Sequence, residues 1–374
     1  MAKDFVTVKS SIRLPHTRIW HTTVAWRSAT IVYGGYAPEE TLKDQISVVF
    51  YHKSGTWTKQ NTYRDFPKHP QCLGANVVND KMFVFGDDEG KMVVYSLDLH
   101  IWIWESFAPS GTSPLGGRLK IASWVARYIV LVPFLFRPSE PMHMPQISFS
   151  ATIHISTNSW EWPNARGDIP SPRFTPSVVI SEDILFLFGG FVPNIGCNDL
   201  FILDMACMRW KKVHGNLSNS EVPSKNMRRP TLTCFSQSTA LLLGRTTHHH
   251  ASNQVNNTWL LNLHNAKNLM DPSSIWTNVP NHSSRCCHAT VLQPLSKILW
   301  VIGGHDGTMD CPYPEGHTTE VLKIKLVKLR PLKELAIEHL GRNLCANDPR
   351  LVHDQLPKEL MNQIETYKSE NGEE

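Results

Sequence analysis

Few residues in this chain stand at spacings that would support catalysis or metal binding. His248, His249 and His250 are consecutive, and imidazole is a common metal ligand. No carboxylate or thiolate accompanies them at ligand spacing, so we interpret them as part of a solvated loop. The vicinal pair Cys286 and Cys287 is too close for an easy disulfide, which predicts two partly buried thiols. With no Ser-His-Asp setting and no Glu/Asp/His triple, we expect no enzymatic activity, cofactor or metal site.

Arginine and histidine recur instead in polar turns some fifteen residues ahead of similar apolar segments. These segments end in glycine and repeat with a period of about 47 to 59 residues, which is typical of stacked repeats. The strong copies are at 31–35, 186–190 and 300–304, degenerate copies are at 83–87 and 241–245, and a sixth without glycine is at 131–134. The turns ahead of four of them contain Arg18 with His21, Arg173, Arg228 with Arg229, and Arg285 with His288.

A tryptophan follows each of the first five segments, twenty to thirty residues downstream. One repeat gives a few short strands that cannot bury both of their faces alone, so the units must stack. A closed ring of such units leaves no exposed sheet edge. The tryptophans are Trp57, Trp104, Trp160, Trp210 and Trp276.

This pattern resembles the kelch repeat over residues 12–328 and implies an all-β, six-bladed kelch β-propeller. An ordinary β-sandwich would not explain five recurring apolar segments with glycine. We expect residues 1–11 to form a separate N-terminal segment and residues 321–328 to supply the outer strands of the last blade. A helical tail is expected at 329–370, followed by a disordered end at 371–374.

The composition excludes several functional classes. The chain has 374 residues, 41% of them hydrophobic, and a net charge of only +4, which gives no reason to expect nucleic acid or membrane binding. No run of apolar residues has the length of a signal peptide or membrane span. Eight cysteines without regular spacing suit a reducing compartment. We therefore expect a cytoplasmic protein, a nuclear protein, or both.

The tail contains two short segments with helical spacing. Leu332, Leu335, Ala336 and Leu340 would form one apolar stripe. A second helix starts with a proline, and its stripe contains Leu356, Pro357, Leu360 and Ile364. The alternative is that both helices only cap the propeller.

The two segments resemble the elongin-binding box and the cullin box of adaptor subunits in elongin–cullin ubiquitin ligases. The resemblance implies that Leu332 enters a pocket on elongin C, which pairs with elongin B, and that Ala336 fills the small position. Leu356, Pro357 and Leu360 match a cullin-2 box, while the late position of Ile364 leaves cullin-5 as the less favoured choice. A cullin-3 adaptor would need an N-terminal dimerisation domain, for which about fifteen residues are too few.

A kelch propeller followed by these boxes resembles the Kelch domain-containing protein 1/2 group of substrate receptors, several of which capture the C-terminus of a client protein. The resemblance implies a concave pocket with arginines that hold a free carboxylate. Arginines and histidines in such turns often only brace loops, and the expected turn is only partly kept here. A kelch interaction scaffold, cytoskeletal or trafficking, is the alternative function. The candidate client-binding residues are Arg228, Arg229, Trp259, Asn256, Arg285 and His288.

Overall fold

The computed structural model divides the chain into two compact units, Met1–Lys325 and Leu326–Glu374. It describes residues 5–35, 48–64, 74–88, 91–111, 119–124, 128–133, 151–154, 157–171, 173, 175–192, 195–218, 222–225, 227–246, 256–279, 285–293, 296–305 and 317–326. The expected tail helices, with Leu332 to Leu340 and Leu356 to Ile364, lie outside the described residues.

The described strands form six sheets, in agreement with the six expected repeats. Five sheets have four strands and the fourth sheet has five. The third sheet, with the sequence copy that lacks glycine, is described by its strands and their pairing, while most of its side chains are outside the described set. The chain is therefore an all-β propeller, as the repeat pattern predicts.

The strands follow one another through the blades in chain order. Blade one contains β2 (Thr22–Trp26), β3 (Ala29–Tyr33), β4 (Val48–Tyr51) and β5 (Thr56–Lys59), and blade two β6 (Gly74–Val78), β7 (Lys81–Asp88), β8 (Lys91–Asp98) and β9 (Ile103–Phe107). Blade three contains β10 (Leu119–Trp124), β11 (Tyr128–Pro133), β12 (Ala151–His154) and β13 (Ser159–Glu161). Blade four contains β15 (Ser177–Ser181), β16 (Ile184–Val192), β17 (Ile195–Asp204) and β18 (Arg209–His214), to which β14 (Arg166–Gly167) adds in parallel. Blade five contains β19 (Met227–Cys234), β20 (Thr239–Thr246), β21 (Asn256–Asn262) and β22 (Trp276–Asn278), and blade six β23 (Ala289–Gln293), β24 (Ile298–Ile302), β25 (Glu320–Leu326) and β1 (Phe5–Arg13).

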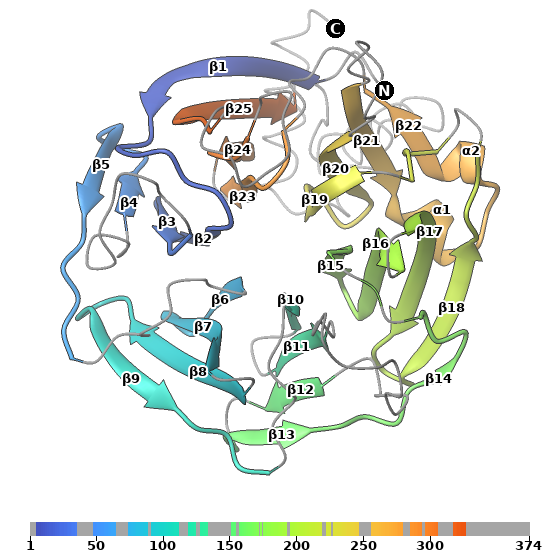
Figure 1. Cartoon of the computed structure of the whole chain (residues 1–374), viewed down its shortest axis with the longest axis horizontal. Helices are drawn as coiled ribbons and strands as arrows, with labels where there is room; N and C mark the ends of the chain where they lie inside the picture. The colour runs from blue at the N-terminus through green and yellow to red at the C-terminus, as the bar shows by residue number, and fades with distance from the viewer. Residues whose placement is uncertain are drawn as a thin grey trace, which may run out of the picture. The chain divides into compact units, whose positions relative to one another are not determined.

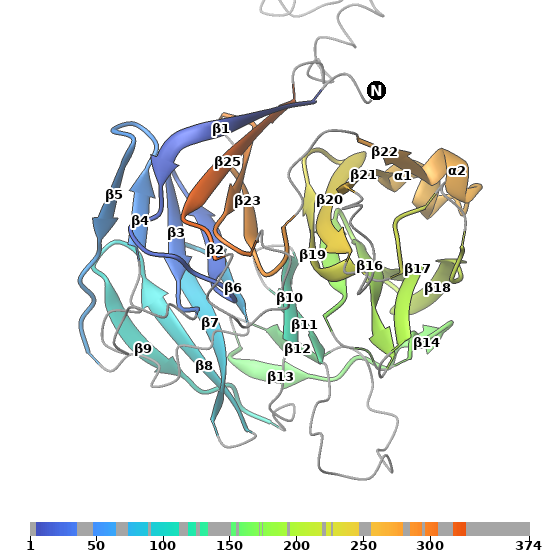
Figure 2. The ribbon, with the colours of Figure 1, turned by 45° about the horizontal axis from the view of Figure 1, so that its top comes forward.

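The first strand of each blade contacts the first strand of the next, and β23 of blade six contacts β2 of blade one. This closes the first unit into a ring (Figure 1). Closure joins the two ends of the domain, because β1 is the outer neighbour of β25 in the last sheet (Figure 2). From the repeat pattern, residues 1–11 were expected outside the propeller and residues 321–328 in the outer position of the last blade. In the structure β25 is the third strand and β1 covers its edge, which removes an edge open to pairing with another chain.

The apolar segments of the repeat form the second strands of the blades, a position that the repeat pattern alone did not assign. In blade four Phe186, Leu187 and Phe188 are all fully buried, because this strand has a blade core on each of its faces. Gly189 and Gly190 follow with φ of 64° and 99°, a conformation that costs glycine little. The register of β16 against β17 shifts between Phe188 and Gly190, so the glycine pair ends the regular ladder.

The repeated tryptophans stand on the fourth strands of the first five blades. Four are buried and Trp57 is half-buried. Truncation of a buried tryptophan to alanine typically costs ~3–5 kcal/mol, so these side chains contribute much of each blade's stability. Their partners in register on the third strands are apolar in every case: Phe50 for Trp57, Leu97 for Trp104, Ile153 for Trp160, Leu203 for Trp210 and Leu261 for Trp276.

Blade five departs from the all-strand expectation. Two short helices, α1 (Leu263–Lys267) and α2 (Pro272–Ile275), replace the tight turn between its third and fourth strands. Asn262 and Asp271 cap them, each by accepting a backbone N–H of the first turn. Leu263, Ala266 and Ile275 join the core between blades four and five, so the insertion extends this core.

The ring has two ends that differ in their connections. We call one end the glycine face, because the glycines that follow the second strands lie there. First strands begin, second strands end and third strands begin at this face. At the hairpin face lie the tight turns between first and second strands and between third and fourth strands. Long connections at the glycine face include those between β3 and β4 and between β20 and β21, whereas the α1–α2 connection of blade five lies at the hairpin face. Loops of this kind on a rigid scaffold commonly carry binding residues.

Candidate functional site

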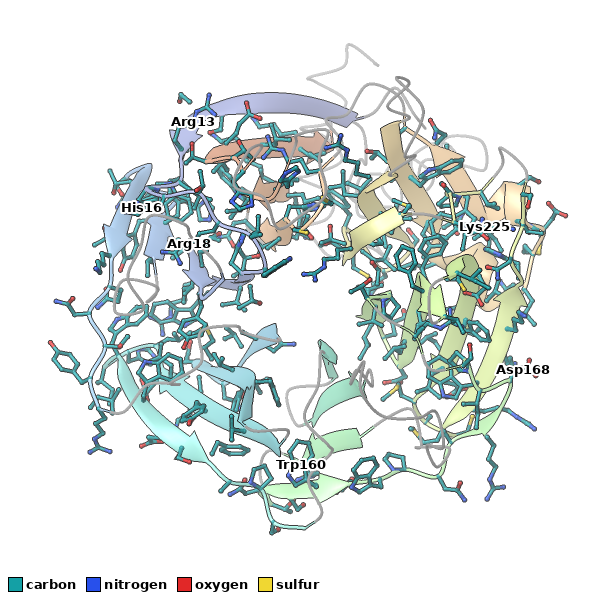
Figure 3. All side chains as sticks on the ribbon, in the orientation of Figure 1. Arg13, His16, Arg18, Trp160, Asp168 and Lys225 are labelled. Atoms are coloured by element: carbon teal, nitrogen blue, oxygen red, sulfur yellow. The ribbon has the colours of Figure 1, made fainter. Side chains whose placement is uncertain are left out.

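Three of the arginine turns at the glycine face are held by the same contact. Arg18, Arg173 and Arg285 are at most 3% exposed, and each donates from Nη1 to the carbonyl of the first glycine of its own blade. The distances are 3.0, 3.0 and 3.3 Å. Figure 3 shows Arg18 with Arg13 and His16 along the segment that leads from β1 into β2. The recurring arginine therefore ties the start of a blade to the end of its second strand.

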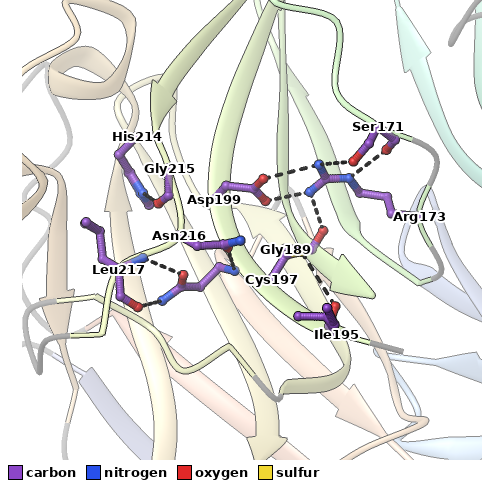
Figure 4. Close-up of polar contacts among 11 residues, drawn as sticks. Ser171, Arg173, Gly189, Ile195, Cys197, Asp199, His214, Gly215, Asn216 and Leu217 are labelled. Atoms are coloured by element: carbon purple, nitrogen blue, oxygen red, sulfur yellow. Dashed lines mark hydrogen bonds and ion pairs between the residues drawn. The ribbon is translucent and has the colours of Figure 1, made fainter. Parts of the chain in front are cut away.

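Two of these arginines are neutralised by a carboxylate on the third strand. Arg173 donates to both oxygens of Asp199, at 2.5 and 3.2 Å, and also to the carbonyl of Ser171 (Figure 4). Arg285 pairs with the Glu320 carboxylate and donates to the Glu320 carbonyl at 2.8 Å. A buried arginine whose donors are used in this way braces the fold. The candidate client residue Arg285 lies in this buried position.

A left-handed residue recurs two positions after the bracing arginine in blades one, four and six. Trp20, Thr175 and Cys287 have φ of 59°, 46° and 58°. In blade five Arg229 has φ of 43° and precedes a proline, as Thr175 does in blade four. Such φ values are uncommon outside glycine, cost about 1–3 kcal/mol and cluster at binding sites. Arg229 thus occupies the position of Trp20 and Cys287, not that of the bracing arginine.

Arg229 differs from Arg173 and Arg285 in its charge environment. Its side chain is half-buried, and among the residues that the structure describes no carboxylate pairs with it. Its guanidinium carbon lies 4.8 Å from the centre of the Trp20 ring. The backbone N–H of Trp20 donates to the Cys287 carbonyl at 3.3 Å, so the turns of blades five, six and one meet at this point.

His288 lies in the adjoining seam between blades five and six. Its Nε2 shares a hydrogen bond of 2.8 Å with Oγ1 of Thr231, two residues after Arg229. Two residues further along the chain on each side, Thr233 and Thr290 share a hydroxyl hydrogen bond of 2.7 Å. The structure therefore brings His288 and Arg229 into the same region of the glycine face.

The remaining candidates are distributed over blade five. Trp259 is buried in the core between blades four and five, where it stands in register with Leu242. Arg228 and Asn256 are both register partners of Arg245, so their backbones share one cross-strand row near the glycine face. Their side chains are outside the described set.

The buried histidine of blade one is held neutral. Burial, with the nearby charges of Arg18 and His288, lowers the pKa of His21 from 6.5 to about 3. The Cε1 atom of His21 would lie 2.9 Å from a Cβ placed on Gly303, so the blade-six glycine packs directly on this ring. Among the described residues, no group of three or more histidine, cysteine or acidic side chains could hold a metal ion.

Trp20 is the residue of this region that the candidate list omits. Its type was visible in the sequence as part of the blade-one turn. Its left-handed backbone and its contact with Arg229, 209 positions away in the chain, have no local sequence signal.

The fold and the repeated turns define a kelch-repeat β-propeller domain. Residues 145–328 match the KLHDC2/KLHL20/DRC7 Kelch-repeats domain family, a match that covers just under half of the chain. The solved structure of YjhT aligns with a TM-score of 0.57 at 10% identity, covering 83% of this chain and 95% of that one, which shows the fold alone. None of the described helices is long and apolar enough to cross a membrane.

The curated relatives are distant. Kelch domain-containing protein 1 from Homo sapiens is 22% identical, with 93% of this chain and 89% of that protein aligned. Kelch domain-containing protein 2 from Bos taurus is also 22% identical, over 54% of this chain and 58% of that protein. Acyl-CoA-binding domain-containing protein 4 from Arabidopsis thaliana is 23% identical, and the chain spans only 29% of its length. The family match and the two Kelch domain-containing relatives support a kelch-repeat propeller domain of the protein-binding kind in this chain.

Proposed function

We propose that this chain is a non-catalytic substrate-recognition subunit of a cullin-2–elongin B/C ubiquitin ligase. The propeller would hold a client protein at its glycine face, and the tail would join it to elongin C and the cullin. The chain would accelerate ubiquitin transfer by proximity, without an active site of its own. Such a ligase would act in the cytoplasm, the nucleus, or both.

The observation that carries the client-binding part is the charge of Arg229. Arg173 and Arg285 are buried against carboxylates, whereas Arg229 is half-buried with no carboxylate partner among the described residues. A guanidinium group that no carboxylate neutralises can form two parallel hydrogen bonds with the carboxylate of a ligand. A client C-terminus supplies such a carboxylate, and Arg228, the preceding residue of β19, is the second arginine that the sequence suggests for it.

Leu332→Asp tests the recruitment part. Leu332 and Leu340 would each contribute about 1.5–3 kcal/mol on burial in a helix-binding groove, so a charge at the first should abolish co-purification of elongin C. Leu351→Asp, a leucine between the two predicted boxes, is the matched control and should leave co-purification intact. Undiminished co-purification of elongin C with the Leu332→Asp variant would refute the elongin-box assignment. The interaction-scaffold alternative would then remain.

Charge reversal at Arg228 and Arg229 together tests the client part. It should abolish client binding and leave elongin C recruitment unchanged, while loss of the Trp20 contact lowers the Tm by only about 1 °C. Intact client binding in this double variant would refute the carboxylate clamp.

A further inference from the structure

The contact between Trp20 and Arg229 joins two blades that are not neighbours in the ring. Arg229 belongs to blade five and Trp20 to blade one, and the Cys287 turn of blade six lies between them. Trp20 is half-buried and packs on the small apolar cluster of Ile19, Cys286 and Cys287. This cluster thus holds the indole, and the Arg229 guanidinium lies over the indole ring.

Both residues stand at the left-handed position of their blades. Blade four has Thr175 at the same position, with φ of 46°. The backbone therefore aims these side chains in the same way relative to each blade, and their type decides what they contact. The tryptophan in blade one and the arginine in blade five are the pair that can stack.

Stacking and carboxylate binding use different parts of a guanidinium group. The planar face stacks on an aromatic ring, while the N–H donors point outward in the plane. With its carbon 4.8 Å from the ring centre, the Arg229 guanidinium is within the range of a cation–π contact. An arginine held in this way loses less conformational entropy when a ligand binds, and preorganisation of this kind raises affinity.

We infer that Trp20 is a positioning residue that holds the Arg229 guanidinium in place for a carboxylate ligand. The inference rests on the proposed function, because the carboxylate is that of the client. Trp20 itself needs no hydrogen bond to the ligand. Its effect on binding passes through Arg229.

The test uses the full chain, four variants and two measurements. Trp20→Phe keeps an aromatic face, and Trp20→Leu and Trp20→Ala remove it. Thr175→Ala changes the same backbone position in a blade without the arginine contact. The binding probe is the tightest peptide that the wild-type chain selects from a library with free C-termini, measured against its C-terminal amide. The second measurement is the rate at which phenylglyoxal modifies Arg229, followed by mass spectrometry of the digested chain.

We expect Trp20→Ala and Trp20→Leu to lower the preference for the free acid by about 2- to 5-fold, the factor that corresponds to a partly exposed cation–π contact. The modification rate of Arg229 should rise in the same two variants. Trp20→Phe should stay near wild type in both measurements, and Thr175→Ala should change neither. Trp20→Leu serves if Trp20→Ala does not fold, since leucine keeps most of the packing on the cluster.

The outcomes separate this inference from the proposed function. An unchanged free-acid preference and an unchanged modification rate in both non-aromatic variants would overturn the positioning role and leave the clamp standing. A wild-type chain that selects no peptide, or that binds acid and amide equally, would overturn the proposed clamp together with the inference. A loss that Trp20→Phe shares in full would show that indole packing, and not its aromatic face, is what matters.

Discussion

Substitution of Arg285 by alanine should damage the fold far more than it damages any binding surface. Arg285 is 1% exposed and donates to the Gly303 carbonyl, the Glu320 carbonyl and the Glu320 carboxylate. Its removal takes the buried counter-charge from Glu320, which is itself largely buried, and Arg13, 3.8 Å away and mostly exposed, is a weaker substitute. Breaking a buried pair from one side typically costs about 3–5 kcal/mol.

The thermal shift follows from the size of the first unit. Unfolding about 325 residues, with an entropy of ~2.1 cal/mol/K per residue, gives a fall in Tm of roughly 4–7 °C for this loss. Arg229→Ala removes a partly exposed cation–π contact of about 0.5–1 kcal/mol, so its Tm should fall by roughly 1 °C. Differential scanning fluorimetry of both variants, with Arg173→Ala as the equivalent brace in blade four, measures the contrast.

The same two arginines separate stability from binding. Arg285→Ala should retain client affinity in the fraction that stays folded at low temperature, whereas Arg229→Ala should lose it. A Tm for Arg285→Ala within 2 °C of wild type, with client affinity lost, would refute the assignment of Arg285 as a brace.

Two further predictions concern His21 and Gly304. Because the pKa of His21 falls from 6.5 in the unfolded chain to about 3 in the fold, its stabilising contribution is complete above pH 6.5 and is lost as the pH falls toward 3; at pH 5 the loss is about 2 kcal/mol. His21→Phe should flatten this part of the pH dependence measured by chemical denaturation between pH 8 and pH 5, and an unchanged slope would contradict the burial argument. Gly304→Ala should cost about 1–3 kcal/mol, because φ is 95° and a Cβ would lie 2.8 Å from both the Cys286 carbonyl and the His288 Cβ. Gly55→Ala, with φ of 70° and open space around it, is the control and should cost less; equal losses in the two variants would show that crowding at Gly304 does not matter.

Much of the architecture could be predicted from the chain itself, because it depends on local patterns. Fully apolar segments ending in glycine predict buried strands, and β3, β16 and β24, the second strands of their blades, are such strands. The spacing of the tryptophans predicts one in each of the first five units, and in the structure each stands on the fourth strand of its blade. Both signals arise from requirements that every blade meets separately.

Closure of the ring and the short helices of blade five could not be predicted in the same way. The segment of β1 resembles many half-exposed strands, and its partner β25 begins more than 300 residues later. The α1–α2 insertion contains few apolar residues, and its burial depends on the core between two blades.

The candidate site was predicted only in part. Trp259 and Arg285 were assigned to client binding from their residue types. Whether each side chain is buried or available to a client depends on strand register for Trp259 and on a partner in another strand for Arg285. Glu320 lies 35 positions after Arg285, so nothing near the arginine indicates that its charge is neutralised. Arg229 stands out only once its backbone conformation and the absence of a carboxylate among the described residues are known.

The central claim is that Arg229 makes the glycine face a receptor for a carboxylate. The most direct measurement is the affinity of the wild-type chain and of Arg229→Ala for one selected peptide, as its free acid and as its amide, by fluorescence polarisation. Because a hydrogen bond to a charged group contributes about 1.5–3 kcal/mol, the wild-type chain should prefer the acid by about 10- to 100-fold, and Arg229→Ala should bind both forms equally. Equal binding of acid and amide by the wild-type chain, or an acid preference that persists in Arg229→Ala, would contradict the claim.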